Sequence, residues 1–308
     1  MFNLPFKHWS GFTRAVVIIL LAIFLFDVQS AIIKHIGDRY PVQQIASFRN
    51  LFGIIPCLLI LSLSREWHER GRKLLIVQWR FGLARGLFIA IAQFCLYLSI
   101  TKMELATAIT LTYIGPIFIT LLSIPILRLT VGFWRWVAVG IGFCGVLLIM
   151  QPGADVFSPY ALLPVCAAFG YSIAIVSSKL FYDEVPSAII NLYTTVGALA
   201  SSTILLFSTT GYIPIISLND WLWLVAMGFV GGCAVLLLIT AYRLTQPGSL
   251  SPFEYFGIPF SFILGWVFFG EAPFDRLFPG VIMVVAGGLI IAWREHKSRI
   301  MPARTIVE

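Results

Sequence analysis

Residues 104–127 read ELATAITLTYIGPIFITLLSIPIL, a run of 24 residues in which Glu104 is the one charged side chain. An α-helix needs about 20 mostly apolar residues to cross the hydrocarbon core of a bilayer, and this run is long enough. It therefore predicts a transmembrane helix. Nine other segments have the same character: 15–33, 43–63, 80–100, 133–150, 158–178, 188–208, 221–241, 247–268 and 276–293.

The composition of the chain agrees with ten spans. Of its 308 residues, 59% are apolar and 11% are charged, whereas a soluble domain carries about 25% charged residues. A soluble enzyme and a disordered chain are excluded on this ground. The net charge of +7 is spread over loops rather than gathered on one face, so we expect no nucleic-acid partner. The predicted fold class is an all-α polytopic membrane protein with ten transmembrane helices and the lipid bilayer as its partner.

The run at 104–127 has a counterpart in the second half of the chain. Tyr113-Ile-Gly115 falls on Tyr255-Phe-Gly257, and the shift that places Tyr113 on Tyr255 is called the repeat offset. Without a gap, the repeat offset also pairs Phe118 with Phe260, Leu122 with Leu264, Val139 with Val281, Gly145 with Gly287, Leu147 with Leu289 and Ile149 with Ile291. Each unit has five spans, an odd number, so the second unit must lie inverted in the membrane. Inverted repeats are typical of secondary transporters, whose substrate site lies near mid-membrane between the repeats.

The repeat divides the chain into four parts. We expect an N-terminal segment at 1–14, a first repeat at 15–150, a second repeat at 151–293 and a C-terminal tail at 294–308. Fifteen of the 21 Lys and Arg residues fall on the side of the two termini and four on the opposite side. Because Lys and Arg accumulate in cytoplasmic loops, this predicts a multi-pass protein of the cytoplasmic membrane with both termini in the cytoplasm.

Several motifs carry a family resemblance: Ala106-Thr-Ala108, Tyr113-Ile-Gly-Pro116, Gly140-Ile-Gly142, Gly145-Val-Leu-Leu-Ile149 and Gln151-Pro-Gly153, then Pro252, Tyr255, Pro259, Gly265, Phe269-Gly-Glu271, Gly280 and Gly287-Gly288. Together they resemble the EamA repeat of the drug/metabolite transporter superfamily. The resemblance implies a ten-helix carrier of small organic solutes that uses no cofactor. It also implies a central cavity lined mainly by spans 1, 3, 4, 6, 8 and 9, with spans 5 and 10 peripheral. One departure is that Leu127-Arg128 stands where the family places an acidic residue, as Glu271 does in the second repeat.

Four charged residues fall inside predicted spans, namely Asp27, Arg49, Arg85 and Glu254. Charges inside a membrane are rare and expensive, so each is a functional candidate. At about 1.5 Å per residue, Asp27 and Arg49 lie at similar depths in adjacent spans, which predicts an ion pair between them. Arg85 and Glu254 lie about 8–10 Å deep and form a second candidate pair. Snorkelling of Arg85 to the interface is the alternative for that residue.

Polar and aromatic residues share helix faces with these charges. We expect the substrate to bind the following residues: Asp27, Arg85, Gln93, Tyr97, Thr110, Tyr113, Tyr171, Ser172, Glu254 and Tyr255. Aromatic faces, hydroxyls, amides and one charge pair suit an amphiphilic metabolite that is aromatic or amino-acid-like. Two cavity arginines are too few for a phosphate-rich substrate. No His lies in a span, so a His-based proton relay, a haem and a metal site are not expected, whereas proton binding by Asp27 or Glu254 is a hypothesis.

Alternatives from three classes stay open at this stage. The favoured function is a secondary transporter, not an enzyme, that moves a metabolite such as a vitamin, S-adenosylmethionine or an amino acid across the cytoplasmic membrane by alternating access, with its direction open. An exporter of drugs or amino acids in the same family is the first alternative, and a membrane-embedded lipid-modifying enzyme is the second. A channel would show a continuous polar stripe or charged rings, which no span has. The glycines of spans 5 and 10 permit close helix contact, within one chain or in a homodimer.

Overall fold

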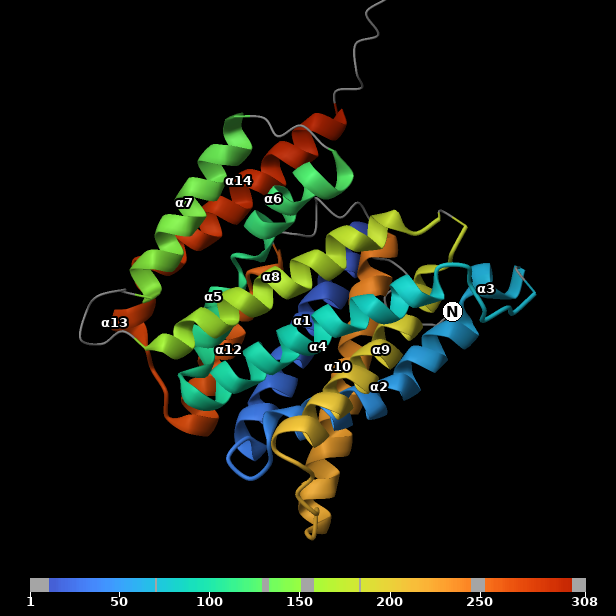
Figure 1. Cartoon of the computed structure of the whole chain (residues 1–308). Coiled ribbons are helices and arrows are strands. Elements are labelled where there is room, and N and C mark those ends of the chain that lie inside the picture. Colours follow the sequence, from blue (N-terminus) through green and yellow to red (C-terminus); the bar gives the residue numbers. More distant parts are fainter. Residues whose placement is uncertain are drawn as a thin grey trace, which may run out of the picture.

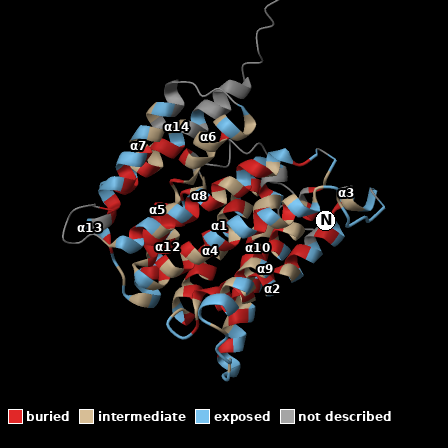
Figure 2. Cartoon of the chain, in the orientation of Figure 1, coloured by how far each residue is buried: buried red, intermediate tan, exposed pale blue. Residues whose placement is uncertain are grey.

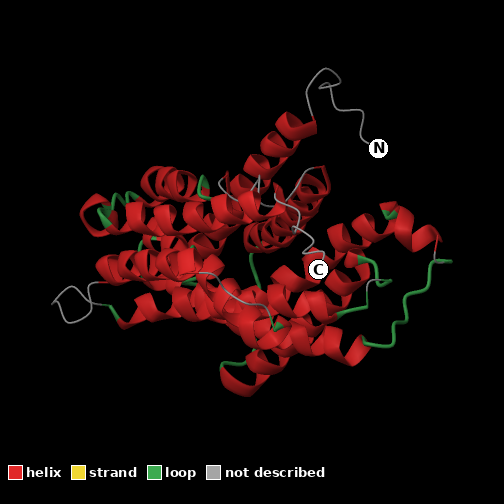
Figure 3. Ribbon diagram, turned by 90° about the horizontal axis from the view of Figure 1, so that it is seen from above, coloured by secondary structure: helices red, strands yellow, loops and turns green. Residues whose placement is uncertain are grey.

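The computed structural model describes residues 11–69, 71–128, 133–150, 158–182, 184–244 and 253–300. In these ranges the chain forms helices joined by turns, with no strand (Figure 3). The helices are α1 (Gly11–Ile36), α2 (Val42–Leu63), α3 (Arg65–Glu69), α4 (Trp79–Lys102), α5 (Leu105–Thr112), α6 (Gly115–Leu127), α7 (Phe133–Met150), α8 (Leu162–Ser177), α9 (Ser187–Thr209), α10 (Leu218–Leu244), α12 (Gly257–Phe269), α13 (Phe274–Leu277) and α14 (Gly280–Ile300). Two 3-10 turns, η1 (Pro159–Ala161) and η2 (Ser178–Leu180), flank α8.

The helices fall where the ten spans were predicted. In the described part of the chain, seven helical segments are long and apolar enough to cross a membrane, and three shorter apolar helices lie at Val139–Met150, Gly257–Phe269 and Gly280–Ile290. Large apolar side chains cover the outside of the molecule, and Ile204, Phe207 and Phe268 are each more than two-thirds exposed. Such an apolar surface suits lipid rather than water. The chain is an all-α polytopic membrane protein.

Two of the predicted spans are not single helices. The span predicted at 104–127 breaks at Tyr113-Ile114, between α5 and α6. The span predicted at 247–268 breaks at Tyr255-Phe256, just before α12. Pro116 and Pro259 follow these breaks and supply no N–H to the turn before them. The repeat offset relates the two breaks, so the repeat in the sequence is also a repeat in the backbone.

The helices form two groups, each built from both repeats. In bundle I, α1 and α2 pack on α10, and α12 packs on α1. In bundle II, α4 packs on α8 and α9, and α6 packs on α8, with α5 continuing into α6. The bundles meet along α2 and α9 and where α5 crosses α12. Helices α7 and α14 pack on each other at one side of the molecule (Figure 1).

The molecule has two ends, called the Gly37 end and the Gly11 end after a glycine at each. The Gly37 end carries the loops at 37–41, 103–104, 210–217 and 270–273, and the Gly11 end carries the start of α1 and the segments at 64–78 and 178–186. A buried apolar cluster closes the Gly37 end with Ile33, Ile36, Ile45, Ile100, Leu105, Leu224 and Met227. Figure 2 shows that the buried positions follow the facing sides of the helices. Helices from both bundles contribute to this cluster, so it holds them together at this end.

Candidate functional site

A cavity of about 360 Å³ lies between the two bundles. This volume falls within the range of small-molecule sites. Its walls come from α1, α2, α4, α5, α8, α9 and α10 and from Tyr113 at the first helix break: Phe26, Asp27, Gln29, Ser30, Arg49, Asn50, Ile89, Gln93, Leu96, Tyr97, Ile109, Thr112, Tyr113, Tyr171, Asn191, Thr194, Thr195, Ala198 and Val235. Among the described residues, α7 and α14 contribute no side chain. The expectation that span 9 lines the cavity is wrong for its described part. Spans 2 and 7, which were not among the spans expected to line it, contribute Arg49, Asn50, Asn191, Thr194 and Thr195.

Carboxamide groups hold one wall of the cavity in place. Asn50 and Gln93 exchange two hydrogen bonds, since Asn50 Nδ2 donates to Gln93 Oε1 at 2.8 Å and Gln93 Nε2 donates to Asn50 Oδ1 at 3.1 Å. Gln29 Nε2 donates to the Tyr97 hydroxyl at 3.3 Å. These contacts join α2 and α1 to α4. They leave the ring of Tyr97 and the neighbouring Tyr171 as aromatic walls.

Asp27 lies about two-thirds of the way along α1 and is 3% exposed. Its Oδ2 atom has no hydrogen-bond partner among the residues that the structure describes. A Cβ atom added to Gly257 would lie 3.3 Å from this oxygen and would overlap the Tyr113 hydroxyl. Because Gly257 is the first residue of α12, the carboxylate faces the positive end of that helix dipole.

Arg49 lies on α2, and its guanidinium faces a different wall from Asp27. Its Nη1 atom donates to Asn50 Oδ1 at 3.2 Å. Its Nε atom is buried, has no partner in the described part of the chain, and lies 3.5 Å from the place of a Cβ on Gly231 of α10. The predicted ion pair with Asp27 is therefore wrong for this structure, because no N–O distance between the two side chains is 4.0 Å or less. The depth of each residue was predictable, but the direction that each side chain takes around its helix was not.

A small side pocket of about 30 Å³ adjoins the cavity at Arg49. Both spaces are lined by Arg49, Asn191, Thr195 and Val235, whereas Cys57 lines only the side pocket. Asn191 Nδ2 points at Cys57 Sγ from 3.4 Å, and a thiol is a weak acceptor. The side pocket thus places a guanidinium, a carboxamide and a hydroxyl around a volume large enough for a water or one small polar group.

The two helix breaks meet beside the cavity. The rings of Tyr113 and Tyr255 lie 5.3 Å apart, and the Tyr113 hydroxyl donates to the backbone oxygen of Glu254 at 2.9 Å. Tyr113 lines the cavity, whereas Glu254 and Tyr255 do not. A Cβ on Gly288 would overlap the Tyr255 hydroxyl, so that ring is turned toward α14. Broken helices at mid-membrane commonly form the substrate site of transporters.

Arg85 does not line the cavity but braces bundle II. Its Nε and Nη2 atoms donate to the carbonyl of Ala174 at 3.2 and 2.5 Å, and Nη1 donates to Thr194 Oγ1 at 2.8 Å. Nε also donates to Ser177 Oγ at 3.1 Å. The residue is 8% exposed, so the snorkelling alternative is not what the structure shows. The predicted pair with Glu254 is also wrong, because neighbouring backbone and hydroxyl oxygens satisfy Arg85 instead.

Five of the ten residues predicted to bind substrate line the cavity: Asp27, Gln93, Tyr97, Tyr113 and Tyr171. Of the others, Thr110 is fully buried in α5, and Ser172 Oγ supports the first helix break by donating to the Gly115 carbonyl at 3.1 Å. Gln29, Asn50 and the polar residues of α9 also line the cavity and were not predicted from the sequence. The spacing of Asn191, Thr194 and Thr195 on one helix face was a usable signal for them.

A charged cluster joins the two bundles at the Gly37 end. Lys34 Nζ lies 2.5 Å from Glu271 Oε1 and donates to the Met103 carbonyl at 2.7 Å. The second carboxylate oxygen, Glu271 Oε2, accepts the backbone N–H of Leu105 at 2.8 Å. Lys34 and Glu271 belong to bundle I and its loop, and the turn at 103–105 belongs to bundle II. This Lys34–Glu271 cluster therefore connects the bundles.

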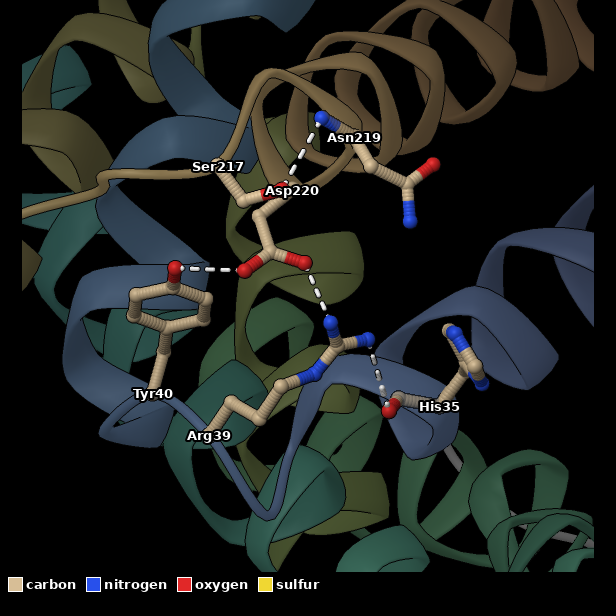
Figure 4. Close-up of polar contacts among 6 residues, drawn as sticks. All are labelled: His35, Arg39, Tyr40, Ser217, Asn219 and Asp220. Carbon is tan, nitrogen blue, oxygen red and sulfur yellow. Dashed lines mark hydrogen bonds and ion pairs between the residues drawn. The ribbon is translucent and has the colours of Figure 1, made fainter.

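A second contact at this end holds α10 against the loop after α1. Asp220 binds Arg39 through one oxygen and accepts the Tyr40 hydroxyl through the other at 2.8 Å (Figure 4). Burial and this hydrogen bond raise the pKa of the Tyr40 hydroxyl above its usual value, so it remains a donor. The repeat offset pairs Asp220 with Gln78, which binds the Leu180 carbonyl and the Tyr182 N–H at the Gly11 end. The two repeats thus use the same joint, with an ion pair at one end and an amide at the other.

The Lys34–Glu271 cluster has no such equivalent in the sequence. The repeat offset pairs Arg128 with Gly270, and both end their helices in the left-handed conformation. The next residues, Leu129 and Glu271, are therefore equivalent, and Leu105 corresponds to Pro247. Leucine has no carboxylate and proline has no backbone N–H. The sequence at these two equivalent positions therefore lacks both partners of the Glu271–Leu105 bond.

Comparison with known proteins identifies one family and one solved structure with the same fold. A model of the EamA-like transporter family matches residues 13–151 and again residues 158–293. One solved crystal structure shares the fold, with a TM-score of 0.61 and 18% identity over 93% of this chain and 99% of the other.

Three relatives have names that state a substrate. A riboflavin transporter of Vibrio cholerae is 32% identical over 202 residues, which cover 62% of this chain and 64% of the relative, less than two-thirds of its length. An S-adenosylmethionine uptake transporter of Rickettsia bellii is 23% identical over 91% of this chain and 93% of the relative. A pseudopaline exporter of Pseudomonas aeruginosa is 26% identical over 90% of this chain and 92% of the relative. The three names share transport of a small organic metabolite, but they differ in substrate and direction.

Proposed function

The chain belongs to the EamA-like transporter family, and on that premise we propose that it carries an amphiphilic, aromatic or amino-acid-like metabolite across the cytoplasmic membrane by alternating access. The observation that carries this proposal is the cavity of about 360 Å³ between the two bundles. It combines the aromatic rings of Tyr97 and Tyr171 with carboxamides and two ionisable side chains. Such a mixture suits a solute with a flat or apolar part and several polar groups.

Alternating access requires one end of the protein to be closed while the other is accessible. The Lys34–Glu271 cluster and the apolar cluster around Ile36 and Ile100 support closure at the Gly37 end. Toward the Gly11 end the cavity reaches Asn191, and the side pocket continues to Cys57. With the termini in the cytoplasm, as the distribution of Lys and Arg favours, this arrangement corresponds to an inward-facing state.

Import is the favoured direction, and export is the second candidate. The names of the riboflavin and S-adenosylmethionine relatives state transport and uptake, whereas the pseudopaline relative is an exporter. The lipid-modifying alternative would need convergent acid, base or nucleophile groups near one interface. Of its two candidates, Arg85 and Glu254, Arg85 donates to backbone and hydroxyl oxygens and lies outside the cavity lining. The proposal also includes proton binding by Asp27, which would couple transport of the metabolite to the proton gradient.

Counterflow in proteoliposomes tests the function. Vesicles containing the purified protein are loaded with one unlabelled compound, and uptake of its labelled form is followed. The panel contains riboflavin, S-adenosylmethionine and the proteinogenic amino acids, and vesicles without protein set the background. We expect saturable exchange of at least one compound. Folded protein that exchanges none of them, or that modifies lipid without moving a solute, would contradict the proposal.

A further inference from the structure

The cavity contains two ionisable side chains, Asp27 and Arg49, that form no ion pair with each other. Asp27 faces the first residue of α12, Gly257, while Arg49 faces Gly231 of α10 and the side pocket. Their atoms Asp27 Oδ2 and Arg49 Nε are both buried, and neither has a hydrogen-bond partner among the described residues. A buried ion pair would satisfy both groups at once, but these side chains are more than 4.0 Å apart.

Leaving Asp27 Oδ2 and Arg49 Nε without a partner, and both side chains without an opposite charge, is costly inside a membrane. Removing a charge from water without compensation costs several kcal/mol, and intramembrane charges are kept where they bind something. The dipole of α12, which begins at Gly257, offsets part of the cost of ionising Asp27. An arginine stays protonated in nearly every protein environment. A cation beside Asp27 would hold the carboxylate ionised, so the occupied cavity would present one negative and one positive group on different walls.

We propose that the transported metabolite is dipolar, with a carboxylate that binds Arg49 and a cationic group, such as an ammonium, that binds Asp27. This inference rests on the proposed function and narrows its substrate class. The part of the metabolite between the two charges lies against Tyr97 and Tyr171. A neutral solute would leave both side chains without an oppositely charged partner, and an anion would leave Asp27 without one.

The surroundings of Arg49 fit a carboxylate. The side pocket brings Asn191 and Thr195 next to the guanidinium, so an incoming carboxylate finds an amide and a hydroxyl donor beside the charge. Asn191 gives up only its contact with the thiol of Cys57. Arg49 Nε and its second terminal nitrogen form the planar fork that binds carboxylates through two hydrogen bonds.

The surroundings of Asp27 fit a cation. Its free oxygen lies beside the Tyr113 hydroxyl, which donates to the Glu254 carbonyl and leaves its own lone pairs available as acceptors. Thr112, at the C-terminal end of α5, also lines the cavity and precedes Tyr113 in the chain. The negative end of the α5 dipole adds to the attraction for a positive group.

Derivatives of one exchanged amino acid test the two contacts separately. The amide derivative keeps the ammonium and lacks the carboxylate, and the N-acetyl derivative keeps the carboxylate and lacks the ammonium. In the wild type we expect each derivative to compete about 10- to 100-fold more weakly than the amino acid, as for the loss of one hydrogen-bonded charge. Arg49→Gln should weaken the amino acid by a similar factor and leave the amide derivative nearly unchanged. Asp27→Asn should weaken binding of the amino acid by a similar factor and leave binding of the N-acetyl derivative nearly unchanged.

Exposed charges supply the matched controls, since Arg80→Gln and Asp275→Asn make the same chemical changes outside the cavity. A purely structural role for Asp27 or Arg49 would weaken all three ligands equally, and that result overturns the proposal. It is also overturned if riboflavin, which is uncharged at neutral pH, is exchanged while no dipolar compound is. That second outcome leaves the carrier function intact, whereas a failure of every compound contradicts the carrier function as well.

Discussion

Removing the Glu271 carboxylate should open the Gly37 end of the protein. Glu271 makes two charge-assisted contacts: one with Lys34 Nζ at 2.5 Å, within bundle I, and one with the N–H of Leu105 at 2.8 Å, which crosses to bundle II. The two side chains of the ion pair are only 13% and 20% exposed, so solvent screens them less than a surface pair. Gln at position 271 keeps one acceptor and loses the charge. At about 1.5–3 kcal/mol for a hydrogen bond to a charged group, the closed state loses roughly a factor of 10 to 100 relative to the open state.

The opening is measured by cysteine labelling. After the native cysteines are replaced, Ser30→Cys places one thiol in the cavity. An impermeant maleimide is added from the Gly37 side, and its rate of reaction is compared with and without Glu271→Gln. We expect about tenfold faster labelling or more. Asp275→Asn removes an exposed carboxylate from the same loop region and should change nothing. Equal labelling rates with and without Glu271→Gln would show that the cluster does not hold this end closed.

Three further changes probe the framework around the cavity. Gly257→Ala should cost about 1–3 kcal/mol of stability, because the new methyl group overlaps the Tyr113 hydroxyl; the double variant with Tyr113→Phe should recover part of the loss, and no recovery would refute the clash. Arg85→Met should lower the melting temperature in detergent through the loss of four buried hydrogen bonds, without changing which substrates compete; a changed substrate profile would place Arg85 in the binding site after all. Asp220→Asn should lower thermal stability more than Gln78→Ala, because it breaks an ion pair and not only amide contacts; the reverse order would contradict the comparison of the two joints.

Much of the fold follows from patterns that the sequence shows directly. Apolar runs long enough to cross a bilayer located the spans, and the match of Tyr113-Ile-Gly115 with Tyr255-Phe-Gly257 located the repeat. The sequence also marks the positions of the two helix breaks, since Tyr113 and Tyr255 are equivalent residues of the two repeats. The breaks themselves were not predicted, because a proline such as Pro116 is compatible with a kink, a break or the first turn of a helix. Only the packing of α5 against α12 selects among these.

The site was harder to predict than the fold. Depth along a helix is nearly linear in residue number, so Asp27 and Arg49 were expected at similar depths. Asp27 lies about two-thirds of the way along α1 and Arg49 about one-third of the way along α2, which runs in the opposite direction. The wall that each side chain faces depends on how the helices are rotated and packed, and this is set by close contacts such as Gln29 against Gly231. Arg85 shows the same limit, since its partners are the backbone of Ala174 and hydroxyls from α8 and α9.

The glycines of α7 and α14 are used within one chain. A Cβ on Gly145 would approach the Gly280 carbonyl at 2.7 Å, and one on Gly142 would overlap Ile117. Gly288 accommodates the Tyr255 hydroxyl. These contacts account for Gly142, Gly145, Gly280 and Gly288 within one chain, whereas a Cβ on Gly140 would meet open space.

The one-sided Lys34–Glu271 cluster has a kinetic consequence. Two identical inverted halves would give the empty carrier two orientations of equal energy, but Leu129 and Pro247 prevent that equality. A carrier that moves one solute without a coupled ion must have the same Vmax/KM in both directions, since otherwise it would build a gradient from nothing. The cluster therefore cannot make such a carrier unidirectional. It can only make Vmax and KM differ together between the two faces, so that one face saturates at a lower concentration than the other.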